Sequence, residues 1–162
     1  MRDVELAWMA GIFDGEGCIS IGHVSPNVRN DLKNPSYRLT VKVTMGHEPT
    51  IRRVAEIVGV GTVHRHQARS IAANESWSWV AMARNAEMAI VLLRPWLLTK
   101  ADEADVALEF MRLPDVKRGG KGGSQPIDRG LLERKHELYL RCAQLKPRNR
   151  FRKTPARSTC DA

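Results

Sequence analysis

The chain has few cysteines and no long apolar run. Its three cysteines are Cys18, Cys142 and Cys160, and they form no C-x-x-C pair. That number and spacing exclude a disulfide framework and a cysteine-based zinc site. No apolar stretch approaches the roughly 20 residues of a membrane-spanning helix, and no basic start with an apolar run marks a secretory signal. We therefore expect a soluble, intracellular, single-domain protein of 162 residues with no membrane association.

Acidic residues become scarce toward the C-terminus. Residues 1–112 contain 13 Lys and Arg and 13 Asp and Glu, whereas residues 113–162 contain 13 and 5, which accounts for the net charge of +8. This excess favours a polyanionic partner bound through phosphate attraction. For residues 148–157 alone, a solvated basic tail without a specific partner is the simpler interpretation.

The hydrophobic pattern predicts helices and strands in a fixed order: a helix, two strands, a second helix, two more strands and two helices. Asn85 and Thr99 are the expected N-caps of the last two helices. Four strands joined by hairpins, with helices between the pairs, indicate an α+β fold whose antiparallel sheet is covered on one face. Beyond this core of residues 1–113 we expect a basic Gly-rich linker (114–126), a further helix (127–146) and a basic, disordered tail (147–162).

The segment Tyr37 to Met45 alternates between apolar and polar residues. Its polar face carries only cationic and hydroxyl side chains, which are the types that contact phosphates and base edges: Arg38, Thr40, Lys42 and Thr44. The simpler alternative is a strand half exposed to solvent.

The first helix combines a small-residue stripe with acids at its end. Ala7, Gly11 and Gly15 recur every fourth position, which would let a second helix approach closely, while Leu6, Met9 and Phe13 would face a core. Asp14 and Glu16 follow at the helix C-terminus, whose partial negative charge disfavours carboxylates. A bound cation would relieve that repulsion.

The string Met9-Ala-Gly-Ile-Phe-Asp-Gly-Glu-Gly17 resembles the LAGLIDADG motif of homing endonucleases. The alternative is a core helix followed by a Gly-rich turn. The resemblance spans Leu6 to Leu113 and implies the αββαββα fold of that family. It places Glu16 at the metal-binding acid, makes the Gly15 carbonyl a second ligand, and implies Mg²⁺ as the cofactor. Because the motif occurs once, it implies a homodimer packed through Ala7, Ala10, Gly11 and Asp14.

In that family the open face of the sheet lies over the DNA major groove. The resemblance therefore adds double-stranded DNA as the partner, and the cationic face of the sheet fits this role. Further DNA-binding candidates on this face and near its loops join the strand residues above: Arg29, Lys33, His64, Arg65, His66 and Arg69. The spacing of His47, His64 and His66 does not make a metal-ligand set.

Lys100 ends a segment, Leu93 to Lys100, that resembles the family segment ending in a catalytic lysine. The alternative is that Lys100 merely begins an exposed helix, where a cation is unfavourable. Some relatives carry a water-positioning glutamine at the place of Met45. Its absence leaves that contact to Thr44, His47 or Glu48, or leaves the water organised in another way, or indicates weak cleavage.

These features favour a dimeric, metal-dependent, site-specific DNA endonuclease with a nearly palindromic target. It would act in the cytoplasm or nucleoid of a prokaryote or phage host, or in an organelle. The alternative is an RNA-splicing maturase, with intron RNA as its partner, or a DNA-binding regulator, either of which would keep the fold without cleavage. A basic ribosome-associated protein would explain the charge but not the acids at the helix tip.

Overall fold

The computed structural model describes residues 2–25, 35–67, 75–115 and 128–146. Its elements follow the predicted order, with a short 3₁₀ turn before the fourth helix. Their bounds are α1 (Arg2–Glu16), β1 (Gly17–Val24), β2 (Ser36–Met45), α2 (Glu48–Val58), β3 (Thr62–His66), β4 (Ser76–Met82), α3 (Arg84–Leu93), η2 (Arg94–Trp96), α4 (Ala101–Arg112) and α5 (Arg129–Gln144).

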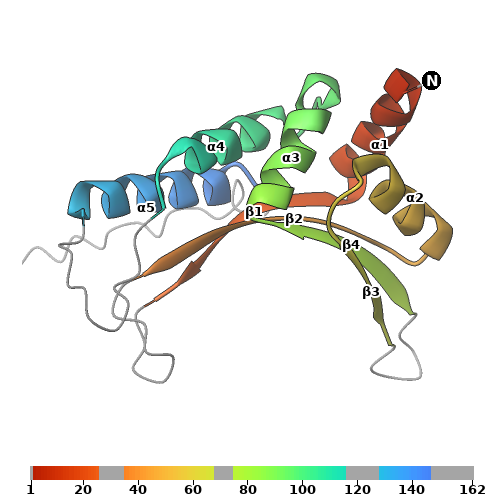
Figure 1. The fold of residues 1–162 in the computed structure, drawn as a ribbon, viewed down its shortest axis with the longest axis horizontal. Helices are drawn as coiled ribbons and strands as arrows, with labels where there is room; N and C mark the ends of the chain where they lie inside the picture. Colours follow the sequence, from red (N-terminus) through yellow and green to blue (C-terminus); the bar gives the residue numbers. More distant parts are fainter. Residues whose placement is uncertain (1, 26–34, 68–74, 116–127, 147–162) are drawn as a thin grey trace, which may run out of the picture.

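The four strands form one antiparallel sheet in the order β1-β2-β4-β3. The helices lie together on one side of this sheet, which curves away from them and leaves its other side uncovered (Figure 1). The loop ends of the two hairpins, β1–β2 and β3–β4, lie at opposite ends of the sheet (Figure 1). The predicted α+β class with a sheet covered on one face is confirmed.

Alternation along the strands sends the apolar side chains toward the helices. Leu39, Val41 and Val43 of β2 are buried in one core with Met9 and Phe13 from α1. On β4, Trp79 is also fully buried. Its indole N–H donates to the carbonyl of Val60 at 2.9 Å, so burial of this large ring leaves no unpaired donor.

Two glycines are required by this packing. Gly61 has a φ of +93°, and a Cβ there would lie 2.6 Å from the indole nitrogen of Trp79. Gly17 joins α1 to β1, where a Cβ would lie 2.7 Å from the ring of Phe13. Only glycine fits both places without a shift of the neighbouring core.

The predicted caps at Asn85 and Thr99 are wrong. Helix α3 begins at Arg84 after Ala83, and α4 begins at Ala101 after Lys100, with no side-chain cap at either position. The Ala83 N–H donates to the carbonyl of Leu39 at 2.9 Å, which pins the chain to the sheet before Asn85 is reached. The hydroxyl of Thr99 has another partner, described below.

Helix α5 packs on β1 and α4 through Leu138, Cys142 and the nearly buried Lys135. Asp128 caps this helix by accepting the Leu131 N–H at 3.0 Å. Most of the expected linker and the whole expected tail lie outside the described residues. Within the described ranges, no helix has both the length and the apolar content needed to cross a membrane.

Candidate active site and nucleic-acid interface

The C-terminal end of α1 is fastened to the turn that precedes α4. One carboxylate oxygen of Asp14 accepts the Leu98 N–H at 2.8 Å, and the other accepts the Lys100 N–H at 3.1 Å. The main-chain carbonyl of Asp14 accepts the Thr99 hydroxyl at 3.4 Å and the Lys100 ammonium. Segments 86 residues apart therefore form one structure, in which Lys100 lies beside the tip that carries Glu16.

The electrostatics of Asp14 follow from these contacts. Partial burial raises the pKa of its carboxyl, but the hydrogen bonds donated by Leu98, Thr99 and Lys100 together outweigh burial. The net effect lowers the pKa below its ordinary value of 3.8. A carboxylate at a helix C-terminus is unfavourable by itself, so these donors explain how α1 tolerates Asp14 there.

The charge of Lys100 is also unfavourable at its own helix end and is also offset by a contact with the other helix. As the residue before α4 it lies at the positive end of that helix, where a cation is disfavoured. Its ammonium, however, reaches a carbonyl in the last turn of α1, at the negative end of that helix. The side chain is thereby held at the junction of the two helices, beside the exposed residues that end α1.

Glu16 and Gly15 differ from Asp14 in being exposed. Among the described residues, no hydrogen bond or ion pair engages the Glu16 carboxylate. A free carboxylate beside the terminal carbonyls of a helix offers the hard oxygen ligands that Mg²⁺ prefers, so these residues fit a divalent metal. In the described part of one chain, no group of three or more His, Cys, Asp or Glu side chains gathers to hold a metal.

The outward side of α1 bears a stripe of exposed residues: Val4, Ala7, Trp8, Gly11 and Gly15. A Cβ built at Gly11 or Gly15 would meet nothing within 4 Å. The described part of the chain does not itself need glycine at these positions. Ala10 was expected in this stripe, but it is fully buried among the chain's own core residues. The prediction that Ala10 contacts a partner is therefore wrong, because its position on the helix turns it toward the sheet.

The uncovered side of the sheet is polar and basic. The strand registers place Arg38, Thr40, Lys42 and Thr44 of β2 on this side, with Ser20 of β1 opposite Thr40 and Ser78 of β4 opposite Thr44. Arg38 and Lys42 are the charged side chains among the described strand residues on this side, and no acid accompanies them there. This pattern suits contact with a polyanion.

Arg65 does not share this side of the sheet. It pairs with Trp77, which in turn pairs with the partly buried Met45, so all three point toward the helices. Its guanidinium forms a salt bridge with Glu75 at 2.7 Å. The prediction that Arg65 lies with Arg38 and Lys42 is wrong, because strand alternation puts odd-numbered β3 residues on the helix side.

His64 and His66 do lie on the uncovered side, where each bonds a hydroxyl. His64 Nε2 is 2.8 Å from the Thr62 hydroxyl, and His66 Nε2 is 2.7 Å from the Ser78 hydroxyl. The sequence analysis did not assign Ser78 to the uncovered side. Its place between Trp77 and Trp79, which share the helix side, could have revealed this by strand alternation. Three predicted contacts, Arg29, Lys33 and Arg69, lie outside the described residues.

No family model matches the sequence, and no curated protein is detectably similar to it. Solved structures do match. Homing endonuclease I-CvuI, crystallised with the I-CreI target and Mg, shares 20% identity over 90% of this chain and 84% of its own, with a TM-score of 0.71. The archaeal intron-encoded homing endonuclease I-Vdi141I, complexed with DNA, shares 14% identity over 90% and 86%, with a TM-score of 0.69.

A third match is the LAGLIDADG homing endonuclease I-GzeII in complex with its DNA target. It shares 11% identity over 83% of this chain and 43% of its own, with a TM-score of 0.63. At these identities the likeness is one of fold. The helix-tip motif and the sheet topology agree with it, and the chain has the fold of the LAGLIDADG homing endonucleases.

Proposed function

We propose that this chain is a site-specific, double-strand DNA endonuclease that acts as a homodimer and depends on a divalent metal. The observation that carries the proposal is the bond from the Lys100 ammonium to the Asp14 carbonyl, which places Lys100 at the same end of α1 as Gly15 and Glu16, beside an uncovered basic sheet. The three similar structures described above were each solved in complex with DNA, which supports the same partner for this chain.

DNA would lie against the uncovered side of the sheet. Arg38 and Lys42 would neutralise phosphates, which contributes affinity. Arg38, which lies nearer the loop end of the β1–β2 hairpin, can also donate to a base edge. Thr40, Thr44, His64 and His66 present hydroxyl and imidazole groups that can donate to or accept from base edges. Thr40 and Thr44 are half-buried, and their β-branched side chains have a restricted χ1 angle, which favours direct recognition over a flexible contact.

The Glu16 carboxylate and the Gly15 carbonyl would hold the metal, which when bound supplies charge neutralisation at the phosphate and an activated water. We assign Asp14 to holding the turn rather than to the metal, because each of its carboxylate oxygens accepts an N–H group of its own chain and the side chain is thereby directed toward that turn. Asp14 instead positions Lys100. The Lys100 ammonium would stabilise the negative charge that develops as the phosphodiester bond breaks.

A second copy of the chain would occupy the outward stripe of α1. Trp8 is 41% exposed and Val4 is 74% exposed, and beyond them toward the C-terminal end of α1 the surface is reduced to the backbone at Gly11 and Gly15. Two such stripes related by a two-fold axis can approach closely. They would bring the Glu16 carboxylates of both copies together, so that each chain supplies an acidic metal ligand that a single chain lacks.

One observation favours the non-cleaving alternative, a maturase or a DNA-binding regulator. Met45 occupies the strand end where some relatives have a water-positioning glutamine, and it packs against the core opposite Trp77. It cannot organise water. Of the three side chains that could replace the glutamine, His47 bonds the Thr50 hydroxyl and Glu48 bonds Arg52. Thr44 is the neighbouring hydroxyl on the uncovered side, and we assign the water contact to it.

The deciding experiment compares wild type with Glu16→Gln on the DNA that flanks the gene's insertion point. Cleavage is assayed with Mg²⁺ and with Ca²⁺, and binding is assayed by gel shift. We expect Glu16→Gln to lose Mg²⁺-dependent cleavage by more than about 100-fold, because even outer-shell changes at metal sites cost roughly 10- to 100-fold. Binding should be retained or improved, since one source of repulsion to phosphate is removed.

Glu56→Gln on α2 is the matched control, because Glu56 is an exposed acid that pairs only with Arg53 in the described residues. It should cleave as wild type does. A wild-type protein that binds this DNA but never cuts it with Mg²⁺ would establish the non-cleaving alternative. Equal cleavage by Glu16→Gln would remove Glu16 from the catalytic site.

A further inference from the structure

The two hairpins of the sheet are each packed against a helix at the same relative position. In both hairpins, the last strand pair but one before the connecting loop carries at least one ring side chain on the helix side. In β1–β2 this pair is His23 and Tyr37, and in β3–β4 it is Arg65 and Trp77. The two pairs lie at opposite ends of the sheet, one under α5 and the other near α2 (Figure 1).

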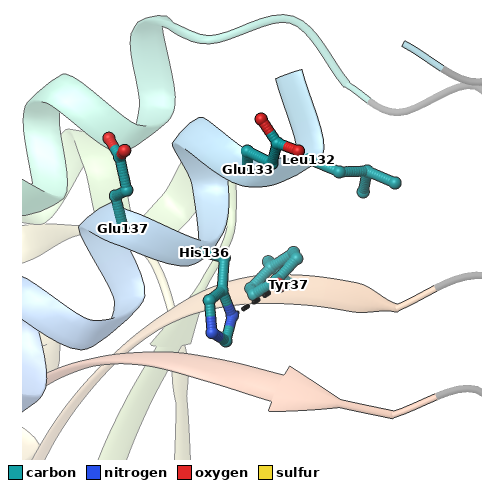
Figure 2. A pocket seen from close by; sticks show the side chains of 5 residues that line it. All are labelled: Tyr37, Leu132, Glu133, His136 and Glu137. Atoms are coloured by element: carbon teal, nitrogen blue, oxygen red, sulfur yellow. Dashed lines mark hydrogen bonds between the residues drawn. The ribbon is translucent and has the colours of Figure 1, made fainter. Parts of the chain in front are cut away.

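The β1–β2 end holds a cluster of four rings, which we call the histidine–tyrosine cluster: His23, Tyr37, His136 and Tyr139. His23 stacks on Tyr37 with centroids 5.0 Å apart, and it meets the rings of His136 and Tyr139 at 5.6 and 5.4 Å. The Tyr37 hydroxyl is 3.0 Å from His136 Nδ1. Figure 2 shows this bond crossing from β2 to α5 beside a pocket lined by Tyr37, Leu132, Glu133, His136 and Glu137.

The β3–β4 end holds a different group, which we call the tryptophan–arginine cluster: Trp77, Arg52 and Arg65. The guanidinium carbons of Arg52 from α2 and Arg65 from β3 lie 5.5 and 5.8 Å from the centre of the Trp77 ring. Each arginine is also paired, Arg52 with Glu48 at 2.7 Å and Arg65 with Glu75 at 2.7 Å. A carboxylate beside the cluster therefore balances the charge of each arginine.

Neither cluster faces the uncovered side of the sheet. Ring contacts are directional, because aromatic pairs and cation–π pairs favour particular orientations, so they resist twisting of the strands they join. The side chains that point the other way at these ends, Arg38 in β2 and His64 and His66 in β3, depend on the same backbone for their direction.

We propose that each cluster is a positioning device for its own hairpin, so that His136 and Arg52 control base discrimination at opposite ends of a DNA half-site without touching DNA. This inference rests on the proposed DNA-binding function. It goes beyond that function because it assigns specificity to two residues on helices, on the far side of the sheet. Loss of a cluster should loosen one hairpin only.

The test uses His136→Ala and Arg52→Ala as mutual controls, in the full chain. Amide hydrogen exchange without DNA measures the hairpins, and selection from a library of randomised DNA duplexes measures base preference. We expect His136→Ala to speed exchange in β1–β2 alone and Arg52→Ala in β3–β4 alone. Each variant should relax base preference by about 3- to 10-fold, which is the effect that loss of one or two ring or cation–π interactions implies. The two variants should do so at different base positions of the half-site.

His136→Phe keeps a ring in the cluster but not the bond to Tyr37, and it should restore most of the preference. Uniform loss of preference over all positions, or both variants affecting the same positions, would overturn the proposal. Unchanged exchange in both hairpins would overturn it as well. If wild type selects no DNA sequence, the proposed function fails, and hydrogen exchange alone then decides whether the clusters hold the hairpins.

Discussion

The inward and outward sides of α1 differ in how closely the rest of the chain packs against them. On the inward side, Met9, Ala10 and Phe13 are buried, and Gly17 just beyond has no room for a Cβ. On the outward side, Gly11 and Gly15 have open space around them. Both sides contain small residues, yet only the inward ones are explained by the fold of the chain itself.

The same division separates the two acids at the tip of the helix. Asp14 is held by backbone N–H groups of the turn before α4, and it serves the fold. Glu16, two residues further along, is exposed and has no such partners among the described residues. Asp14 therefore helps to hold this structure together, whereas Glu16 remains available to a metal, to DNA or to a second copy.

The largest effect should come from filling the outward side. Gly11→Leu leaves the fold of one chain intact, because nothing lies near that position, but it should push two α1 helices apart. We expect dimer affinity to fall by about 100-fold or more, because a two-fold axis places one overpacked leucine from each copy in the interface. Light scattering checks the oligomeric state. A variant that remains dimeric and binds DNA normally would show that this stripe is not the interface.

Filling the inward side should instead destabilise the single chain. Gly17→Ala places a Cβ 2.7 Å from the Phe13 ring, and we expect the free energy of unfolding to fall by about 1–3 kcal/mol. Gly22→Ala is the control, because a Cβ there makes only an ordinary contact with the Arg38 carbonyl at 3.5 Å. Urea denaturation measures both. Equal stability of the two variants would contradict the close packing at the α1–β1 junction.

Asp14→Asn should sharpen the contrast between the two acids. Its carboxylate accepts two backbone N–H groups, so we expect a loss of about 1–3 kcal/mol at neutral pH. The folded-state pKa of Asp14 lies below 3.8. Its charged form therefore stabilises the fold above that pH, and the contribution disappears as the pH falls through the folded-state pKa. The two proteins should converge in stability in that acidic window, and a difference that stays constant as the solution is acidified through it would rule this out.

The smallest effect concerns the two faces of the sheet. Replacing Arg38 and Lys42 together with Ala should reduce the slope of log affinity against log salt by about 0.9 for each phosphate that is no longer neutralised. Arg65→Ala should leave that slope unchanged, because Arg65 points toward the helices and pairs with Glu75. A reduced slope for Arg65→Ala with no change for the double variant would reverse the assignment of faces.

Much of this architecture could be predicted from local pattern. Alternation in Tyr37 to Met45 predicted the buried and uncovered faces of β2, and the spacing of Leu6, Met9 and Phe13 predicted the inward side of α1. These patterns are visible in sequence because burial repeats with the period of the element. The prediction for Ala10 failed because its face depends on how α1 is rotated against its neighbours. The prediction for Arg65 failed although alternation along β3 already separates Arg65 from His64 and His66.

The sequence by itself determined the order of the elements, the basic excess and the acids at the end of α1, since each depends on residue type and local spacing. Only the tertiary structure decided that Asp14 binds the turn at Leu98 and Lys100, and that Trp77 lies near Arg52 and Arg65. It also decided that His23 and Tyr37 meet α5. Contacts between segments 86 or 99 residues apart arise from packing the whole core, and no local period encodes them.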